Sequence, residues 1–278
     1  MQPRISIVTP SYNQGHFLEA ALDSVLDQGY ANLEYIVIDG GSTDDSPAII
    51  ARRADRLAYW VSEPDRGQSH AINKGFKQAT GAIYGWLNSD DLYEEGALAE
   101  AARLLGGKQR ALLVGAAVLT DGPETLSGHT DSRQPTWEEI LYDARSFPQP
   151  SVFWTSDLWE LAGPLDEDLY FAMDYDLWVR MMPHVQETIF TERVLSYERS
   201  HPDQKSAEKS TDLFHQQRAY AAVRAARQTH RSVWGWLVRI WLRRAALAVR
   251  RRRPSLLKGS GFHQHALHMA LRPRRSGL

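Results

Sequence analysis

Short apolar runs alternate with helix-like segments over roughly the first 120 residues of the chain. Runs rich in Ile, Val and Leu predict buried strands, and apolar residues three or four positions apart predict helices. The predicted strands cover residues 4–9, 34–39, 57–61, 82–87 and 111–119. The predicted helices begin after Gly15 and at residues 44–54, 68–79 and 94–105. This alternation, with short connections, predicts right-handed βαβ units and a mostly parallel sheet in an α/β fold.

Polar residues stand where these predicted strands end. Thr9 and Pro10 close the first strand, Asp39 closes the second, and Asp90 and Asp91 follow the fourth. Ligands of open α/β sheets bind beyond the carboxyl ends of the strands. We therefore expect a ligand site at this edge of the sheet.

The pattern loosens after about residue 120. Residues 121–135 are rich in Gly, Pro, Ser and Thr, which predicts a loop. Further helices are expected at residues 137–142, 157–161 and 174–182, before a last strand at 187–197. From residue 211 onward the sequence predicts basic helix.

Charge divides the chain into two parts. The formal net charge is −2, but residues 211–278 hold fifteen Lys and Arg against one acid, Asp212. That segment is therefore +14, and residues 1–210 are −16. An acidic body joined to a basic tail predicts a single domain over 1–210 and a basic helical C-terminal extension over 211–278.

Composition limits the classes of protein that fit. The 278 residues are 43% hydrophobic and 24% charged, a mix typical of soluble globular chains. The chain has no cysteine, which excludes disulfides, zinc–thiolate sites, iron–sulfur clusters and thiol nucleophiles. Neither a secretory signal nor a run of about 18 uncharged apolar residues is visible, so we expect a cytoplasmic protein without a membrane-spanning helix.

Asp90 and Asp91 form a carboxylate pair directly after an apolar strand. In a cleft the two negative charges repel each other, and a divalent cation would relieve that repulsion. Hard oxygen ligands favour Mg²⁺ or Mn²⁺. The alternative is a helix cap and a solvated turn ahead of the helix near Glu94.

Three further residues each allow two interpretations. Asp39 can accept hydrogen bonds from a nucleobase or ribose, or it can cap the turn that begins at Gly40. Asp174, at the start of a predicted helix, can act as a general base or as a cap. His201 follows the last predicted strand, and a lone histidine is more often a surface residue than a ligand.

Five motifs, in order along the chain, resemble those of the family-2 inverting glycosyltransferases of the GT-A fold. They lie at residues 9–13, 35–44, 65–75, 88–91 and 174–178. The resemblance runs from about residue 5 to about residue 206, roughly three quarters of the chain. Each motif alone is common, but all five in this order are specific.

The resemblance assigns a role to each matching position. It implies nucleotide and donor binding by Thr9, Pro10, Tyr12, Asp39, Asp65, Gln68, Asn73, Lys74 and Asp90. It also implies that Asp91, helped by His201, ligates Mn²⁺ or Mg²⁺, and that Asp174 is the catalytic base. There are two departures from the family pattern. Met173 stands where many relatives carry Glu, and Ser-Asp-Asp at 89–91 offers only two carboxylates.

The implied activity is inverting, metal-dependent sugar transfer. Asp174 would deprotonate an acceptor hydroxyl, which attacks the anomeric carbon opposite the nucleotide, while the metal neutralises the leaving diphosphate. The donor would be a nucleotide-diphosphate-sugar, UDP-linked by family frequency. The acceptor would be a glycan or lipid-linked saccharide in cell-surface polysaccharide biosynthesis. Two alternatives stay open: transfer to a polyprenyl phosphate, and a non-catalytic, membrane-associated module that retains the fold.

Residues 232–253 form an amphipathic pattern of tryptophan and arginine. At helical spacing Arg239, Arg243 and Arg250 fall on one face, opposite Trp234, Leu237 and Trp241. Such a helix predicts peripheral contact with an anionic membrane, here the inner face of the plasma membrane. Packing of the Trp face on the catalytic domain is a close alternative. No nucleic-acid partner is expected, because the catalytic resemblance favours sugar transfer.

Overall fold

The computed structural model describes residues 2–122, 125–129, 140, 147–202, 204–205 and 212–228. The chain divides into two compact units. The first comprises Met1–Gln134, Phe147–Tyr170 and His184–Pro202, and the second comprises Pro135–Ser146, Phe171–Pro183 and Asp203–Leu278. The first unit contains the sheet, and the second contains helices α7 and α8.

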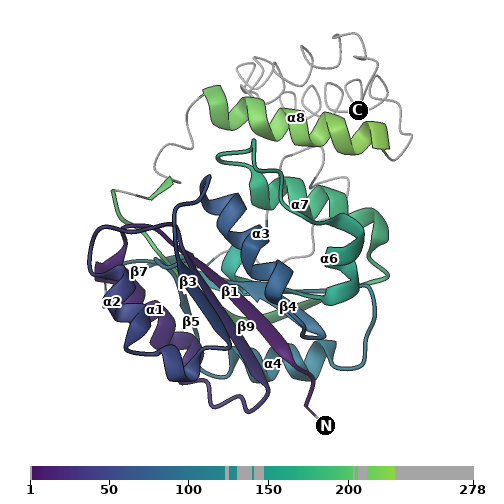
Figure 1. Ribbon diagram of the computed structural model, residues 1–278. Helices are drawn as coiled ribbons and strands as arrows, with labels where there is room; N and C mark the ends of the chain where they lie inside the picture. The colour runs from purple at the N-terminus through teal and green to yellow at the C-terminus, as the bar shows by residue number, and fades with distance from the viewer. Residues whose placement is uncertain are drawn as a thin grey trace. The chain divides into compact units, whose positions relative to one another are not determined.

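One mixed sheet, with nine strands among the described residues, forms the centre of the first unit (Figure 1). The strands are β1 Ile5–Ser11, β2 Leu33–Asp39, β3 Tyr59–Ser62, β4 Ile83–Trp86, β5 Leu92–Tyr93, β6 Ala111–Gly122, β7 Thr125–His129, β8 Val152–Thr155 and β9 Glu187–Arg199. Their order is β3-β2-β1-β4-β8-β6-β9-β5, and β7 pairs with β6. Strands β3, β2, β1 and β4 are parallel to one another, as are β6 and β9. The predicted α/β class with a mostly parallel sheet is confirmed.

Three short strands were not predicted. Strand β8 lies antiparallel between β4 and β6, and all four of its residues are buried, so the apolar Val152, Phe153 and Trp154 show no alternation. Strand β5 has two residues, which pair with β9. The loop predicted over residues 121–135 is wrong at Thr125–His129, because this polar segment pairs antiparallel with β6 as β7.

The predicted helices of the first unit are present. They are α1 Gly15–Leu26, α2 Ser46–Ala51, α3 Gln68–Gln78, α4 Ala97–Leu105 and α6 Ser156–Ala162. Ile7 of the sheet, Leu22 of α1 and Leu98 of α4 belong to one buried cluster. Helix α3 comes close to β1, since a Cβ at Gly75 would lie 2.4 Å from Cγ1 of Val8. Glycine at this position lets α3, which begins after β3, lie directly on the sheet.

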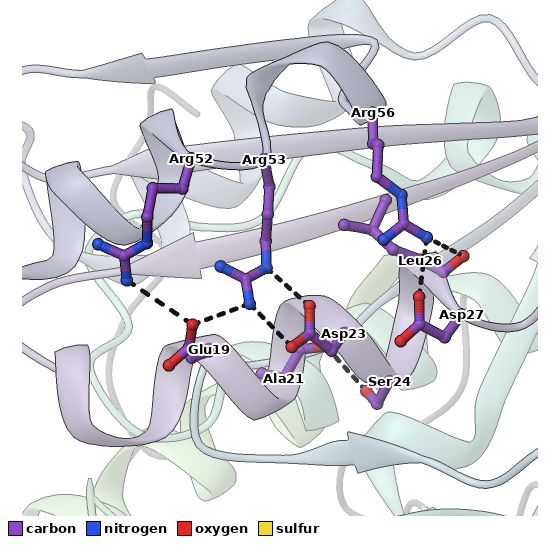
Figure 2. A network of polar contacts seen from close by, with 9 residues as sticks. All are labelled: Glu19, Ala21, Asp23, Ser24, Leu26, Asp27, Arg52, Arg53 and Arg56. Carbon is purple, nitrogen blue, oxygen red and sulfur yellow. Dashed lines mark hydrogen bonds and ion pairs between the residues drawn. The ribbon is translucent and has the colours of Figure 1, made fainter.

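A row of ion pairs joins α1 to the end of α2 and the 3₁₀ turn Ala54–Arg56 (Figure 2). The acids are Glu19 and Asp23 of α1 and Asp27, the residue that follows it, and the bases are Arg52, Arg53 and Arg56. Arg53 is the most buried of the three bases, and its Nε donates to Oδ1 of Asp23 at 2.6 Å. The acids recur every four residues and so face one direction.

The described part of the second unit consists mainly of α7 Met173–Met181 and α8 Asp212–Gln228. Basic helix predicted after residue 211 is confirmed over α8. The predicted amphipathic helix at 232–253 lies outside the described residues, and the boundary at residue 210 stays a prediction. Among the helices that the structure describes, none is both long enough and apolar enough to cross a bilayer.

Candidate active site

Asp39, at the end of β2, is fully buried and holds the turn that follows it. Its Oδ1 accepts a hydrogen bond from Ser42 Oγ at 2.5 Å. Its Oδ2 accepts from the Ser42 backbone N at 2.9 Å and from Ser62 Oγ at 2.6 Å. These bonds match the turn-capping interpretation. Because the carboxylate is fully buried, a nucleobase can bond to Asp39 only if a neighbouring group moves.

Asp65 lies against the same turn. A Cβ at Gly40 would be 2.8 Å from Asp65 Oδ2, so glycine is what allows this approach. Asp65 Oδ1 accepts from the backbone N of Gly67 at 2.7 Å, which fixes the entry to α3. The structure thus brings Asp39 and Asp65, both predicted donor-binding residues, together beyond β2 and β3.

The first predicted motif combines buried and exposed residues. Thr9 is fully buried, and its Oγ1 shares a 2.9 Å hydrogen bond with Tyr35 Oη. Pro10 is also buried, whereas Tyr12 is 62% exposed. Of these three residues, Tyr12 is therefore the one whose ring is open to a ligand.

Asn73 and Lys74 of α3 already have protein partners. Asn73 Nδ2 donates to the backbone O of Leu165 at 3.0 Å, and the Leu165 backbone N donates to Asn73 Oδ1 at 2.8 Å. Asn73 therefore clamps the loop after α6. Lys74 Nζ lies 2.5 Å from Glu63 Oε1, so a donor phosphate must compete with that carboxylate for the ammonium group.

Asn88 lies at the centre of a network of side-chain amides that reaches Asp91 of the carboxylate pair. Its Oδ1 accepts from Gln68 Nε2 at 2.8 Å. Its Nδ2 donates to Gln149 Oε1 at 3.0 Å and to Asp91 Oδ2 at 3.2 Å. Gln149 in turn donates to the backbone O of Trp86 at 2.9 Å. The network places Gln68, a predicted donor residue, two hydrogen bonds from Asp91.

Asp90 and His201 are in contact. Asp90 Oδ2 and His201 Nε2 are 3.1 Å apart, and the two side chains are 18% and 9% exposed. The imidazole also packs on the ring of Phe17, with centroids 4.4 Å apart. The structure therefore brings the segment after β4 into contact with the segment after β9.

Asp91 is buried among negative charges. Burial raises its pKa well above the ordinary value, and the charges of Asp90 and Glu198 raise it further. Hydrogen bonds from Asn88 and from the Arg199 backbone oppose this shift without cancelling it. A positive charge placed beside Asp91 would restore its carboxylate form.

Arg199, the last residue of β9, was missed by the sequence analysis. Its guanidinium donates to the backbone oxygens of Asp90, Ser89 and Phe17. Its own backbone N donates to Asp91 Oδ1 at 3.3 Å. Arg199 therefore fixes the main chain of the carboxylate motif. An arginine two residues before His201 was visible in the sequence, but its carbonyl partners come from distant segments.

Asp174 belongs to the second unit, in the first turn of α7. It is half-buried, and its Oδ1 accepts from the Tyr175 backbone N at 2.7 Å. The next acid, Asp176, is fully buried, and its Oδ2 accepts from Arg180 Nε at 2.7 Å. The two acids thus differ: Asp174 is half-buried, whereas the buried charge of Asp176 is neutralised by Arg180 of the same helix.

The donor chemistry around Asp91 fits a divalent cation. Within the described residues no three His, Asp or Glu side chains are already gathered around one point as a metal site. Asp91 and Asp90 nevertheless offer hard oxygen atoms, and His201 offers a nitrogen atom next to Asp90. Burial and then repulsion from Asp90 and Glu198 raise the pKa of Asp91, and a bound Mg²⁺ or Mn²⁺ would favour its charged form.

Solved structures share this fold. TarS 1-349 of S. aureus superposes with a TM-score of 0.63 at 20% identity, over 79% of this chain and 64% of that one. The mannosyltransferase PcManGT from Pyrobaculum calidifontis, solved in complex with GDP-Man and Mn²⁺, gives 0.59 at 20% identity, over 98% of this chain and 88% of that one. The fold is the GT-A fold of glycosyltransferases.

The sequence comparison then gives the family. The family described as "Glycosyl transferase family 2" matches residues 6–155, more than half of the chain. The chain therefore belongs to glycosyl transferase family 2. An uncharacterized glycosyltransferase of Rickettsia typhi is 29% identical over 73% of this chain and 65% of its own length. One of Mycobacterium tuberculosis is 32% identical over 64% of this chain and 68% of its own length. The chain thus spans about two thirds of the length of these relatives.

Proposed function

We propose that this chain is an inverting glycosyltransferase that moves a sugar from a nucleotide-diphosphate-sugar to an acceptor hydroxyl. The observation that carries the proposal is the contact of Asp90 with His201 beside the buried, charge-repelled Asp91. These are the residues to which the family resemblance gives ribose and metal roles. Membership of the family supports the proposal.

The donor would be held at the carboxyl edge of β1, β2 and β4. Tyr12 offers an exposed ring to the nucleobase. Asp65, and Asp39 once a neighbouring group moves, would accept hydrogen bonds from its polar edge. Lys74 would give up its ion pair with Glu63 and bind the diphosphate, since both partners are anions. A divalent ion held by Asp91, Asp90 and His201 would supply Lewis-acid stabilisation of the leaving diphosphate.

Asp174 is the proposed base. Its carboxylate takes the proton from the acceptor hydroxyl, whose oxygen forms the new bond to the anomeric carbon as the bond to the nucleoside diphosphate breaks. Attack comes from the face opposite the leaving group. A single displacement of this kind inverts the anomeric configuration and needs no covalent enzyme intermediate.

The fold relatives suggest which donors to test. TarS has been solved with UDP and with UDP-GlcNAc, and PcManGT with GDP-Man and Mn²⁺. We propose a UDP-sugar as the donor, and a glycan or lipid-linked acceptor in cell-surface polysaccharide biosynthesis. Peripheral attachment to the inner face of the plasma membrane through residues 232–253 belongs to the same proposal.

A thermal-shift screen with UDP-GlcNAc and GDP-mannose, with and without Mn²⁺, tests the donor class. A ligand at 100 times its Kd should stabilise the protein by about 2.7 kcal/mol. Release of nucleoside diphosphate in the same samples separates an enzyme from a non-catalytic module. If no nucleotide sugar gives either a thermal shift or release of nucleoside diphosphate, the proposal is contradicted.

Transfer to a polyprenyl phosphate is the competing reaction. Its acceptor is already an anion and needs no strong base. Asp174→Asn would then leave turnover nearly unchanged, whereas transfer to a hydroxyl should slow by about 10²–10⁴-fold, the usual size of general-base catalysis.

A further inference from the structure

Helix α8 contacts the start of α7, where Asp174 lies, within the second unit. Gln217 Oε1 accepts from the backbone N of Phe171 at 2.7 Å and from that of Ala172 at 3.4 Å. Ala172 is the N-cap residue of α7, and alanine has no side-chain oxygen to cap a helix. Gln217 therefore fixes, from α8, the two residues through which the chain enters α7.

A second contact brings positive charge to the same turn. The guanidinium of Arg218 lies over the ring of the buried Tyr175, with its carbon atom 4.5 Å from the ring centroid. Burial lowers the pKa of Arg218, and the charge of Asp174 acts in the opposite direction, so the two groups are close enough to interact. Six residues further along α8, Arg224 lies 3.9 Å from the buried carboxylate of Asp176.

Helix α7 has nine residues, and isolated helices of that length are marginal in water. Packing against a neighbour must therefore set its position. The contacts of Gln217 and Arg218 fall on residues 171–175, the turn that carries Asp174.

We propose that α8 positions the Asp174 carboxylate, with Gln217 and Arg218 as positioning residues. The C-terminal basic segment then begins with an element that the reaction requires, and is more than an appendage. The proposal rests on the proposed function, in which Asp174 is the base.

Gln217→Ala in the full chain is the main test, and Gln216→Ala, the same change one residue away, is its matched control. Gln217→Ala should speed amide exchange with deuterium at residues 171–175. It should also lower the kcat for nucleoside diphosphate release from UDP-GlcNAc or GDP-mannose by about 10–100-fold, because small misplacements of a reacting group are costly. The Kd for UDP with Mn²⁺ and the donor KM should not change.

Gln217→Glu keeps the acceptor oxygens and should restore both exchange and kcat to near the wild-type values. If Gln217→Ala does not fold, Gln217→Asn keeps the amide on a shorter side chain and should show the same losses, reduced in size. If Gln217→Ala has the same amide exchange and the same kcat as Gln216→Ala, the proposal is overturned. A loss confined to KM would overturn it as well.

Asp174→Asn in the same assay separates this proposal from the proposed function. An inactive Asp174→Asn beside a fully active Gln217→Ala overturns the positioning role alone. An active Asp174→Asn overturns the base assignment, and the positioning role with it.

Discussion

Arg199 lies over the ring of Phe17, with its guanidinium carbon 4.8 Å from the ring centroid, and also donates to the backbone oxygen of that residue. Phe17 is in α1 and Arg199 ends β9, so one side chain ties the first helix of the sheet domain to its last strand. The same guanidinium holds the main chain of Ser89 and Asp90. The carboxylate motif is therefore fixed from outside its own segment.

Arg199→Met should destabilise the protein by about 3–5 kcal/mol, because it leaves three backbone carbonyls without their donor and the acids Asp90 and Asp91 without their counter-charge. Arg199→Lys keeps the charge but cannot span three carbonyls, so its loss should be smaller. Urea unfolding measures both variants. Arg193→Met, on the exposed side of β9, is the control and should cost at most about 1 kcal/mol. Equal midpoints for Arg199→Met and Arg193→Met would contradict this account.

Glu34 should make stability depend on pH in the acid range. Burial alone would raise the pKa of Glu34, but hydrogen bonds from Ser6 and Thr80 and the charge of Arg4 outweigh it and lower the pKa. Because the pKa of Glu34 is lower in the folded state than in the unfolded state, its charge stabilises the fold at any pH above the unfolded-state pKa. This stabilisation is lost as the pH falls through the folded-state pKa.

Glu34→Gln should therefore cost about 1–3 kcal/mol near pH 7, and its difference from wild type should shrink as the pH falls below about 4. Unfolding by urea at a series of pH values checks this. A difference that stays constant from neutral to acid pH would show that the charge of Glu34 has no part in stability.

Deletion of the chain from Ser232 onward should leave UDP binding intact, because the five family motifs and α8 all precede that residue. It should weaken sedimentation with phosphatidylglycerol vesicles, since each arginine near an anionic surface contributes on the order of 1 kcal/mol. High salt should weaken attachment of the full chain, and neutral vesicles should bind neither form. If truncation unfolds the catalytic domain, or if both forms sediment alike, the Trp face belongs to the core instead.

The parallel half of the sheet could be predicted from sequence because each element carries its own local signal. Strands β1, β2 and β4 are short, mostly apolar runs, and the polar or glycine residues Ser11, Gly40 and Asn88 stand at or just after their ends. Strand β7 has no such pattern and exists through its partner β6, so composition alone predicted a loop there. Strand β8 is too short for periodicity to distinguish it.

The site was only partly predictable for the same reason. The motif positions predicted Asp91 and His201 as metal ligands and Asp90 as a donor-binding residue, and the structure places His201 Nε2 3.1 Å from Asp90 Oδ2. Arg199 and Gln217 were missed because both bind backbone atoms, and which backbone atoms lie nearby depends on the tertiary fold. The hydrogen bonds that Asp39 accepts from Ser42 and Ser62 show that a motif residue can also have a structural role in the folded chain.

Asp91 is the central residue of the proposed metal-dependent nucleotide site. Calorimetric titration of UDP and GDP into the full chain, with and without Mn²⁺, compares wild type with Asp91→Asn and with the control Asp55→Asn on the 3₁₀ turn after α2. Wild type and Asp55→Asn should bind one of the nucleotides much more tightly with Mn²⁺. Asp91→Asn should lose that Mn²⁺ dependence, while its melting temperature without metal should not fall, because the variant removes a buried and repelled charge. Unchanged Mn²⁺ dependence in Asp91→Asn would contradict the account.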